Sequence, residues 1–155
     1  MTRRPRNSFL NQPAYITGRR WDLLTWNSAA HDLFGFAAEE DGEHNLLAYM
    51  FLDPRARRLF GDDWPAVAQR MLAQFRPTFD LWAGDHAFLD LIGHLRNHSP
   101  ECAAWWENHD IRPVTSGQKY LHHLTGERYR YEHATFQASD NPALKLAVFT
   151  LVNLG

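Results

Sequence analysis

The sequence has a single cysteine, no long apolar run and almost no net charge, and each shortage excludes a class of protein. Cys102 alone cannot form a disulfide within the chain, so a reducing compartment is the simplest expectation. No apolar stretch approaches the roughly 20 residues that a membrane-spanning helix needs, and the polar N-terminal region lacks the apolar core of a signal peptide. We therefore expect a soluble, cytoplasmic protein with no membrane partner.

The chain also lacks an excess of positive charge. Lys and Arg total 16 against 18 Asp and Glu, which gives a formal net charge of -2, so the domain offers no cationic field for nucleic acid. Arg3, Arg4 and Arg6 form a local basic start. We interpret residues 1–12 as a short polar arm or linker remnant, because three arginines alone give weak, salt-sensitive binding to phosphate.

Motifs of common enzyme and metal sites are missing as well. There is no Gly-rich phosphate loop, Cys-x-x-Cys, His-Glu-x-x-His or Gly-x-Ser-x-Gly. His94 and His98 are four residues apart but have no third ligand nearby in sequence, which favours surface or capping histidines. Cys102 and His109 would lie about 10 Å apart on one helix, too far for direct proton transfer. We expect a buried thiol, no catalytic residue, no metal and no cofactor.

Aromatic side chains, in contrast, are abundant. Six Trp, five Tyr and ten Phe occur among 155 residues, of which 45% are hydrophobic. This length and composition suit one domain, residues 13–155, with a wide and partly ring-lined interior.

The N-terminal part predicts two strands and a short helix. Ala14–Thr17 and Arg20–Trp26 are expected to pair as an antiparallel hairpin, and apolar side chains on both faces of the second strand predict that both are covered. Asn27 is placed to cap a helix over Ser28–Phe34, and Gly35 can take the left-handed conformation that ends it. Residues 36–44 follow as an acidic, exposed loop.

The middle of the chain predicts helices. Three caps, Asn45, Asp53 and Ser99, each stand before an apolar run with helical spacing. The clearest helix runs from about Trp64 to Phe75, and Pro77 is expected to end it. A further amphipathic helix carries one apolar stripe, made of Phe88, Leu91, Ile92 and Leu95.

The C-terminal part changes to alternating patterns. Strands are predicted over Lys119–His123, Arg128–Phe136 and about 144–152, with a hairpin turn at Thr125 and Gly126. Two strands, several helices and three strands indicate an α+β fold with a single antiparallel five-stranded sheet and helices on one face.

Several segments carry a resemblance to known families. The passage from strand to helix at Trp26–Gly35 resembles the second strand and first helix of a PAS sensor domain. Nearly the whole chain is similar to the ligand-binding domain of MmyB-like transcription regulators. The similar segments, in that family's order, are Pro13–Asn27, Asn45–Leu47, Phe51–Arg57, Ser99–Glu101, Trp105, His109–Asp110 and Ser116–Lys119.

The resemblance implies a PAS-like domain that binds a small molecule such as a fatty acid and regulates an attached helix-turn-helix domain. Only about a dozen residues precede Pro13, so we expect contact with DNA only through a helix-turn-helix domain that this chain lacks. The chain is expected to be either an excised effector domain or a stand-alone one, and a homodimer is a possible assembly.

We place a candidate cavity between the sheet and its helices. Tyr131, His133 or Arg130 is expected to hold a polar head group. The other candidate residues are apolar, and for each alone, core packing is the competing role: Trp26, Phe34, Met50, Phe51, Met71, Phe75, Trp82 and Trp105. Two alternatives stay open: a dimerisation or interaction module without a ligand, and a small α+β enzyme with a polar dyad deep in its pocket.

Overall fold

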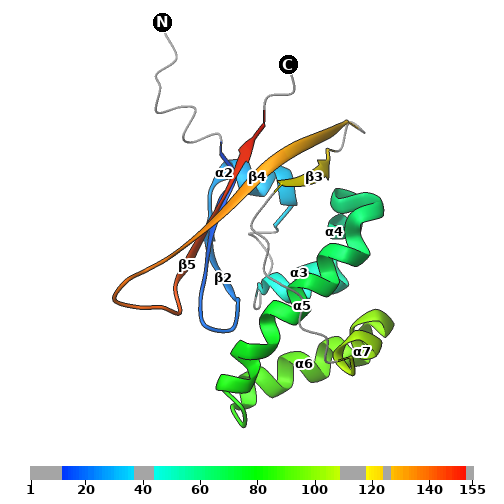
Figure 1. Ribbon diagram of the computed structural model, residues 1–155, viewed down its shortest axis with the longest axis vertical. Coiled ribbons are helices and arrows are strands. Elements are labelled where there is room, and N and C mark those ends of the chain that lie inside the picture. The colour runs from blue at the N-terminus through cyan, green and yellow to red at the C-terminus, as the bar shows by residue number, and fades with distance from the viewer. Residues whose placement is uncertain (1–11, 37–43, 109–117, 124–126, 153–155) are drawn as a thin grey trace, which may run out of the picture.

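The computed structural model describes residues 12–36, 44–108, 118–123 and 127–152. Its centre is one five-stranded antiparallel sheet in the order β2-β1-β5-β4-β3 (Figure 1). N-terminal and C-terminal strands join through the pairing of β1 with β5, which confirms the predicted sheet. The strands are β1 (Ala14–Thr17), β2 (Leu23–Trp26), β3 (Gln118–His122), β4 (Arg128–Gln137) and β5 (Lys145–Leu151).

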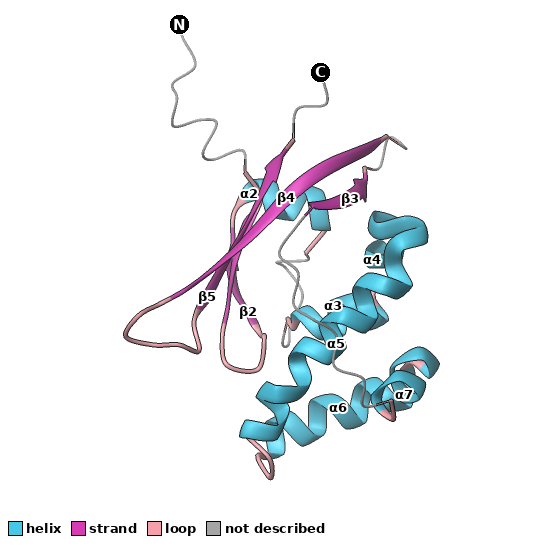
Figure 2. Ribbon diagram, in the orientation of Figure 1, coloured by secondary structure: helices cyan, strands magenta, loops and turns pink. Residues whose placement is uncertain are grey.

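The helices lie between β2 and β3 in the chain and gather on one side of the sheet (Figure 2). This arrangement confirms the α+β class with helices on one face. The helices are α2 (Ser28–Phe34), α3 (Leu46–Leu52), α4 (Pro54–Phe60), the 3-10 turn η1 (Gly61–Asp63), α5 (Trp64–Leu81), α6 (His86–His98) and α7 (Pro100–Trp106).

All four predicted caps are confirmed. The side chains of Asn27, Asn45, Asp53 and Ser99 each accept a hydrogen bond from a backbone N–H in the first turn that follows. Gly35 ends α2 with φ +76°, as its position predicts. The caps therefore fix where four helices begin.

The prediction that Pro77 ends the long helix is wrong, because α5 continues through it to Leu81. Proline removes one backbone donor, but packing outside the helix holds the last turns in place. The ring of Phe79 lies 5.0 Å from that of Trp106, and the Arg76 guanidinium stacks on the same indole at 3.8 Å. These contacts with α7 outweigh one missing hydrogen bond.

The strand predicted over residues 20–26 is too long, and the prediction that both of its faces are covered is wrong. Trp21 has φ +68°, so the chain turns there and β2 starts at Leu23. The pairing register slips at Leu24, which places both Leu23 and Trp26 on the inner face. Leu24 is 56% exposed, so the outer face of β2 has no cover.

Several other predictions fall partly or wholly outside the described residues. They are the N-terminal arm up to residue 11, the centre of the acidic loop at 37–43, the side chain of His109 and the turn at Thr125 and Gly126. Observed strand ends in the C-terminal part differ from the predicted ones by about one residue, which is ordinary for strand boundaries.

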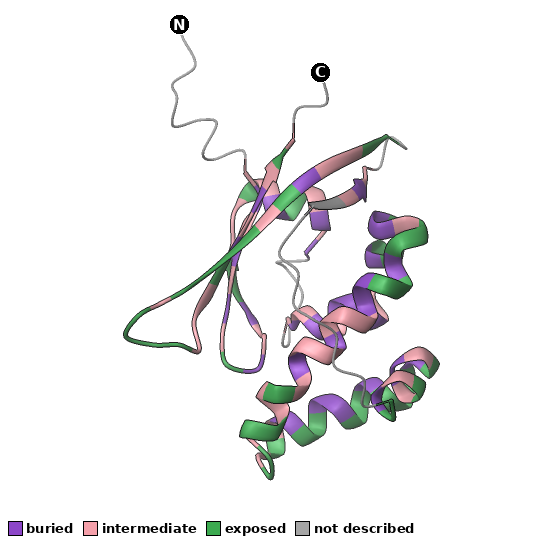
Figure 3. Ribbon diagram, in the orientation of Figure 1, coloured by how far each residue is buried: buried purple, intermediate pink, exposed green. Residues whose placement is uncertain are grey.

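The core is one cluster of buried residues from the sheet and the helices, and buried positions lie on both layers (Figure 3). Where α2 meets the sheet, Phe34 packs edge to face against Tyr15 and Phe149, and the three ring centroids are 5.2–6.2 Å apart. Phe75 and Phe88 stack at 6.0 Å where α5 meets α6, and both are fully buried. Trp21, in the turn before β2, lies 5.1 Å from Phe75 between ring centroids, so the core of the helices continues to the hairpin.

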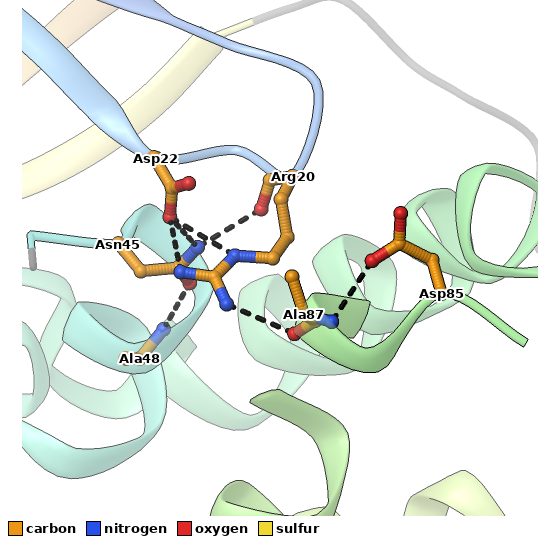
Figure 4. A network of polar contacts seen from close by, with 6 residues as sticks. All are labelled: Arg20, Asp22, Asn45, Ala48, Asp85 and Ala87. Carbon is orange, nitrogen blue, oxygen red and sulfur yellow. Dashed lines mark hydrogen bonds and ion pairs between the residues drawn. The ribbon is translucent and has the colours of Figure 1, made fainter. Parts of the chain in front are cut away.

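A buried arginine links the turn before β2 to two helices (Figure 4). The Arg20 guanidinium donates to Asp22 Oδ1 at 2.9 Å and to the carbonyl oxygen of Ala87, in the first turn of α6, at 2.9 Å. Asn45, the cap of α3, donates to the Arg20 carbonyl oxygen at 2.9 Å and to Asp22 Oδ1 at 3.0 Å. These bonds fix the hairpin against the helical layer.

Candidate functional site

A pocket of about 330 Å³ lies between the inner face of the sheet and helices α2, α3 and α5. Strands β1, β4 and β5 form its floor, and α5 forms the opposite wall.

The floor of the pocket follows from the strand register. Tyr15 and Thr17 of β1 pair with Ala147 and Lys145 of β5, and all four side chains line the pocket. Because side chains alternate across a strand, Phe149 comes next on the same face of β5. Lys145 therefore points to the same side as two buried apolar residues. On β4, the neighbouring floor residues are His133 and Thr135.

The wall formed by α5 is one stripe of its surface. Val67, Arg70, Met71 and Gln74 line the pocket, and their spacing of three and four residues places them on one side of the helix. Val67 is buried, whereas the other three are partly exposed. The wall is thus apolar towards the start of α5 and polar around Arg70 and Gln74.

The deep part of the pocket is apolar and aromatic. Phe34, Met50 and Phe60 are each at most 4% exposed and line it together with Tyr15 and Tyr49. Burial raises the pKa of both tyrosines well above the ordinary value, so both hydroxyls stay protonated at neutral pH. The Tyr49 hydroxyl donates a hydrogen bond to the carbonyl oxygen of Phe34, with 2.6 Å between the two oxygens.

The described lining carries two cationic side chains, Arg70 and Lys145, and no Asp or Glu. Among the residues that the structure describes, neither cation makes a hydrogen bond or ion pair, in contrast to Arg55, Arg57 and Arg96, which all pair with carboxylates. The polar part of the pocket is therefore positively charged.

Four of the eleven candidate residues named from the sequence line this pocket: Phe34, Met50, Met71 and His133. They come from α2, α3, α5 and β4, so the fold brings together residues that are far apart in the chain. His133 lies against Phe149, with ring centroids 4.6 Å apart.

The structure places the other seven candidates elsewhere. Phe51 and Trp105 pack around Trp64, at 5.9 and 5.7 Å between ring centroids, inside the helical layer. Phe75 and Trp82 stack on Phe88, and Trp26 lies against Phe36 and His44.

Tyr131 and Arg130 lie nearer the start of β4 than the pocket residue His133. The Tyr131 hydroxyl is 2.9 Å from His123 Nε2, and Tyr131 lines a different hollow beside α2. Burial lowers the pKa of His123 in spite of the nearby Glu127, so this histidine is neutral at pH 7. Arg130 is the neighbour of Tyr131 in the strand and so points to the opposite face.

The sequence reasoning missed the polar residues of the pocket: Arg70, Gln74 and Lys145. A signal for Lys145 was present, because it alternates in phase with the buried residues Ala147 and Phe149. Arg70 and Gln74 are three and seven residues after Val67, within the stripe that faces the sheet.

The two histidines of α6 also lie outside the pocket. The ring centroids of His94 and His98 are 4.3 Å apart, and His98 Nδ1 is 2.9 Å from the His94 carbonyl oxygen. In the described parts of the chain, no three His, Cys, Asp or Glu side chains are grouped in a way that could hold a metal ion. Nor is any described helix both long and apolar enough to cross a bilayer.

Cys102 is fully buried in α7, and burial raises the pKa of its thiol to about 11. Since only the thiolate is nucleophilic, we expect the native protein to react with an aromatic disulfide reagent at pH 8 at least about tenfold more slowly than the protein unfolded in urea. The release of the coloured thiol measures both rates. Equal rates would contradict the burial of this side chain.

Comparison with known proteins adds one match. A family model described as the MmyB-like transcription regulator ligand binding domain matches residues 7–153, which is nearly the whole chain. No curated protein matches the chain.

Proposed function

Because the chain belongs to the family of ligand-binding domains of MmyB-like transcription regulators, we propose that it senses a small apolar molecule, such as a fatty acid, in the pocket between α5 and the sheet. The family makes this a ligand-sensing regulator domain. The identity of the ligand and the place where it binds are the proposal. The domain acts by binding and without catalysis, in the cytoplasm, and DNA is contacted by a helix-turn-helix domain of the regulator.

The observation that supports this proposal is the pocket itself. Protein interiors are packed as densely as organic crystals and leave few voids larger than a water molecule. A space of about 330 Å³ lined by Phe34, Met50, Met71 and Phe149 is within the range of small-molecule sites, at its lower end. A medium-length acyl chain suits this size and this apolar lining.

Regulation then requires that the ligand bind one arrangement of the domain better than another. The pocket lies between two layers, with α5 on one side and β1 and β5 on the other. A ligand that contacts both layers stabilises the arrangement in which the pocket between them is open. The state of the domain would in turn change a dimer contact or the segment that precedes β1.

Decanoic acid tests the proposal. At a hundred times its Kd, a ligand of the native state adds about 2.7 kcal/mol of stability, which corresponds to a rise of roughly 5–10 °C in Tm for a domain of this size. Differential scanning calorimetry measures the rise. Native mass spectrometry of freshly purified protein, followed by lipid extraction, looks for a ligand that is already bound. A chain that carries no ligand and gains no stability from the acid would contradict the proposal.

One observation favours a second candidate function, a dimerisation module. An apolar row crosses the outer face of the sheet, where Ile16, Leu146 and Phe136 are cross-strand neighbours. Phe136 is 57% exposed and Leu146 37%. If this row joins two copies, Phe136→Glu converts a dimer into a monomer in sedimentation equilibrium. A wild-type monomer at all concentrations would exclude this function.

A further inference from the structure

Arg70 and Lys145 are the two cationic side chains in the described lining of the pocket. We propose that they hold the carboxylate head of an amphiphilic acid whose apolar tail lies among the rings. This inference rests on the proposed function. It adds the residues that hold the carboxylate of such an acid, and they differ from the head-group residues expected from the sequence.

The two cations reach the pocket from opposite layers. Lys145 stands at the start of β5 on the inner face, opposite Thr17 of β1. Arg70 stands on α5, with Gln74 one turn further along the same stripe. One carboxylate between them would contact both the sheet and α5, so its two oxygens could accept from two independent donors.

Electrostatics favour an anion at this place. The described lining contains no Asp or Glu, and neither cation has a partner in the described parts of the chain. A partly buried charge without a counter-ion is destabilised by its loss of water, and an anion relieves this cost. Charge-assisted hydrogen bonds from Arg or Lys to a carboxylate are shorter and about twice as strong as neutral ones.

The rest of the pocket fits the tail of such a molecule. Beyond Lys145, the inner face of β5 continues with Ala147 and Phe149, and Phe34 and Met50 line the deep part. Thr17 and Thr135 lie beside Lys145 on the floor and can donate further hydrogen bonds to the head. The gradient from charged to apolar matches an amphiphile and does not match a neutral hydrocarbon.

Tyr131 and Arg130 are poorly placed for the same role. The Tyr131 hydroxyl already has His123 as its partner, and Tyr131 does not line the pocket. Arg130 points to the opposite face of β4. His133 does line the pocket, but its ring lies against Phe149. The head-group site is therefore assigned to Arg70 and Lys145.

The test compares two ligands with the same tail, decanoic acid and 1-decanol, by isothermal titration calorimetry on the wild type and on variants. We expect the wild type to bind the acid at least tenfold more tightly than the alcohol. Arg70→Gln and Lys145→Gln should each weaken binding of the acid roughly tenfold and leave the affinity for the alcohol within about twofold.

Two further variants guard against indirect effects. Lys145→Arg keeps the charge and should keep the preference for the acid. Arg96→Gln removes an exposed arginine of α6, paired with Glu107 and outside the pocket, and should change neither affinity. Circular dichroism establishes that each variant is folded before titration.

The outcomes separate this inference from the function on which it rests. Equal wild-type affinities for acid and alcohol would overturn the head-group assignment and leave the apolar pocket standing. If the Arg70 and Lys145 variants lost affinity for the acid and the alcohol equally, the assignment would also be overturned. The two residues would then support the structure of the pocket and would not bind the head group. If the wild type binds neither ligand, the inference and the proposed function both fail.

Discussion

Replacing Arg20 by methionine is expected to lower the free energy of unfolding by about 3 kcal/mol, the largest effect on stability that we predict for a single substitution. Arg20 is 8% exposed, and its guanidinium donates to Asp22 and to the carbonyl oxygen of Ala87. Methionine keeps much of the volume but has no donor. Urea unfolding followed by circular dichroism measures the change.

The size of this effect comes from the groups that lose their partner. Without Arg20, the Asp22 carboxylate loses one of its donors and keeps Asn45, and the Ala87 carbonyl oxygen loses its side-chain partner. An unpaired charge or acceptor that stays out of water costs more than the net gain of the original bond. The hairpin would also be less firmly held against α3 and α6.

Arg19→Met is the matched control, since Arg19 is the preceding residue. Its side chain is 45% exposed, lies 3.6 Å from Asp85 and covers the ring of Trp82 at 4.3 Å. Exposed ion pairs and cation–π contacts each contribute at most about 1 kcal/mol, so we expect a loss of at most that order. If the Arg20 and Arg19 variants lost equal stability, the buried network would have no special role.

Replacing Met71 by tryptophan is expected to weaken binding of decanoic acid at least a hundredfold while the domain stays folded. Met71 lines the pocket from the middle of α5 and is only partly buried, so a larger side chain has space to enter. An indole would occupy much of a volume of about 330 Å³. Isothermal titration calorimetry, with the same concentrations of acid for the wild type and the variant, measures the affinity.

Met71→Leu is the control for this substitution. It conserves volume and apolar character, and such changes usually cost less than 1.5 kcal/mol of stability. We expect its affinity for decanoic acid to stay within a few fold of the wild type. Undiminished binding by a folded Met71→Trp protein would show that the acid binds somewhere other than this pocket.

Much of the fold could be predicted because local signals and tertiary contacts agree. Asn27, Asn45, Asp53 and Ser99 cap their helices as their residue types predict. The two failures occur where packing outweighs a local rule. Contacts of Phe79 and Arg76 with Trp106 carry α5 past Pro77, and the Arg20 network accompanies a left-handed turn at Trp21, where no glycine marked it.

The pocket was harder to predict for a physical reason. An aromatic residue in a helix has the same periodicity whether it faces another helix or the sheet. Phe51, Phe75 and Trp105 therefore looked equivalent to Phe34 and Met71, but they pack within the helical layer. The side on which α5 meets the sheet depends on the crossing of the two layers, which a single sequence does not encode directly.

The pairing of β1 between β2 and β5 keeps the pocket close to the segment that precedes β1. Tyr15 and Thr17 line the pocket, and Gln12, three residues before Tyr15 and just outside β1, is anchored on both sides. Its side-chain amide donates to Thr150, and its carbonyl oxygen accepts from Asn27 at 2.8 Å. A displacement of β1 by a bound molecule would therefore move residue 12 as well, because only Pro13 and Ala14 separate it from Tyr15.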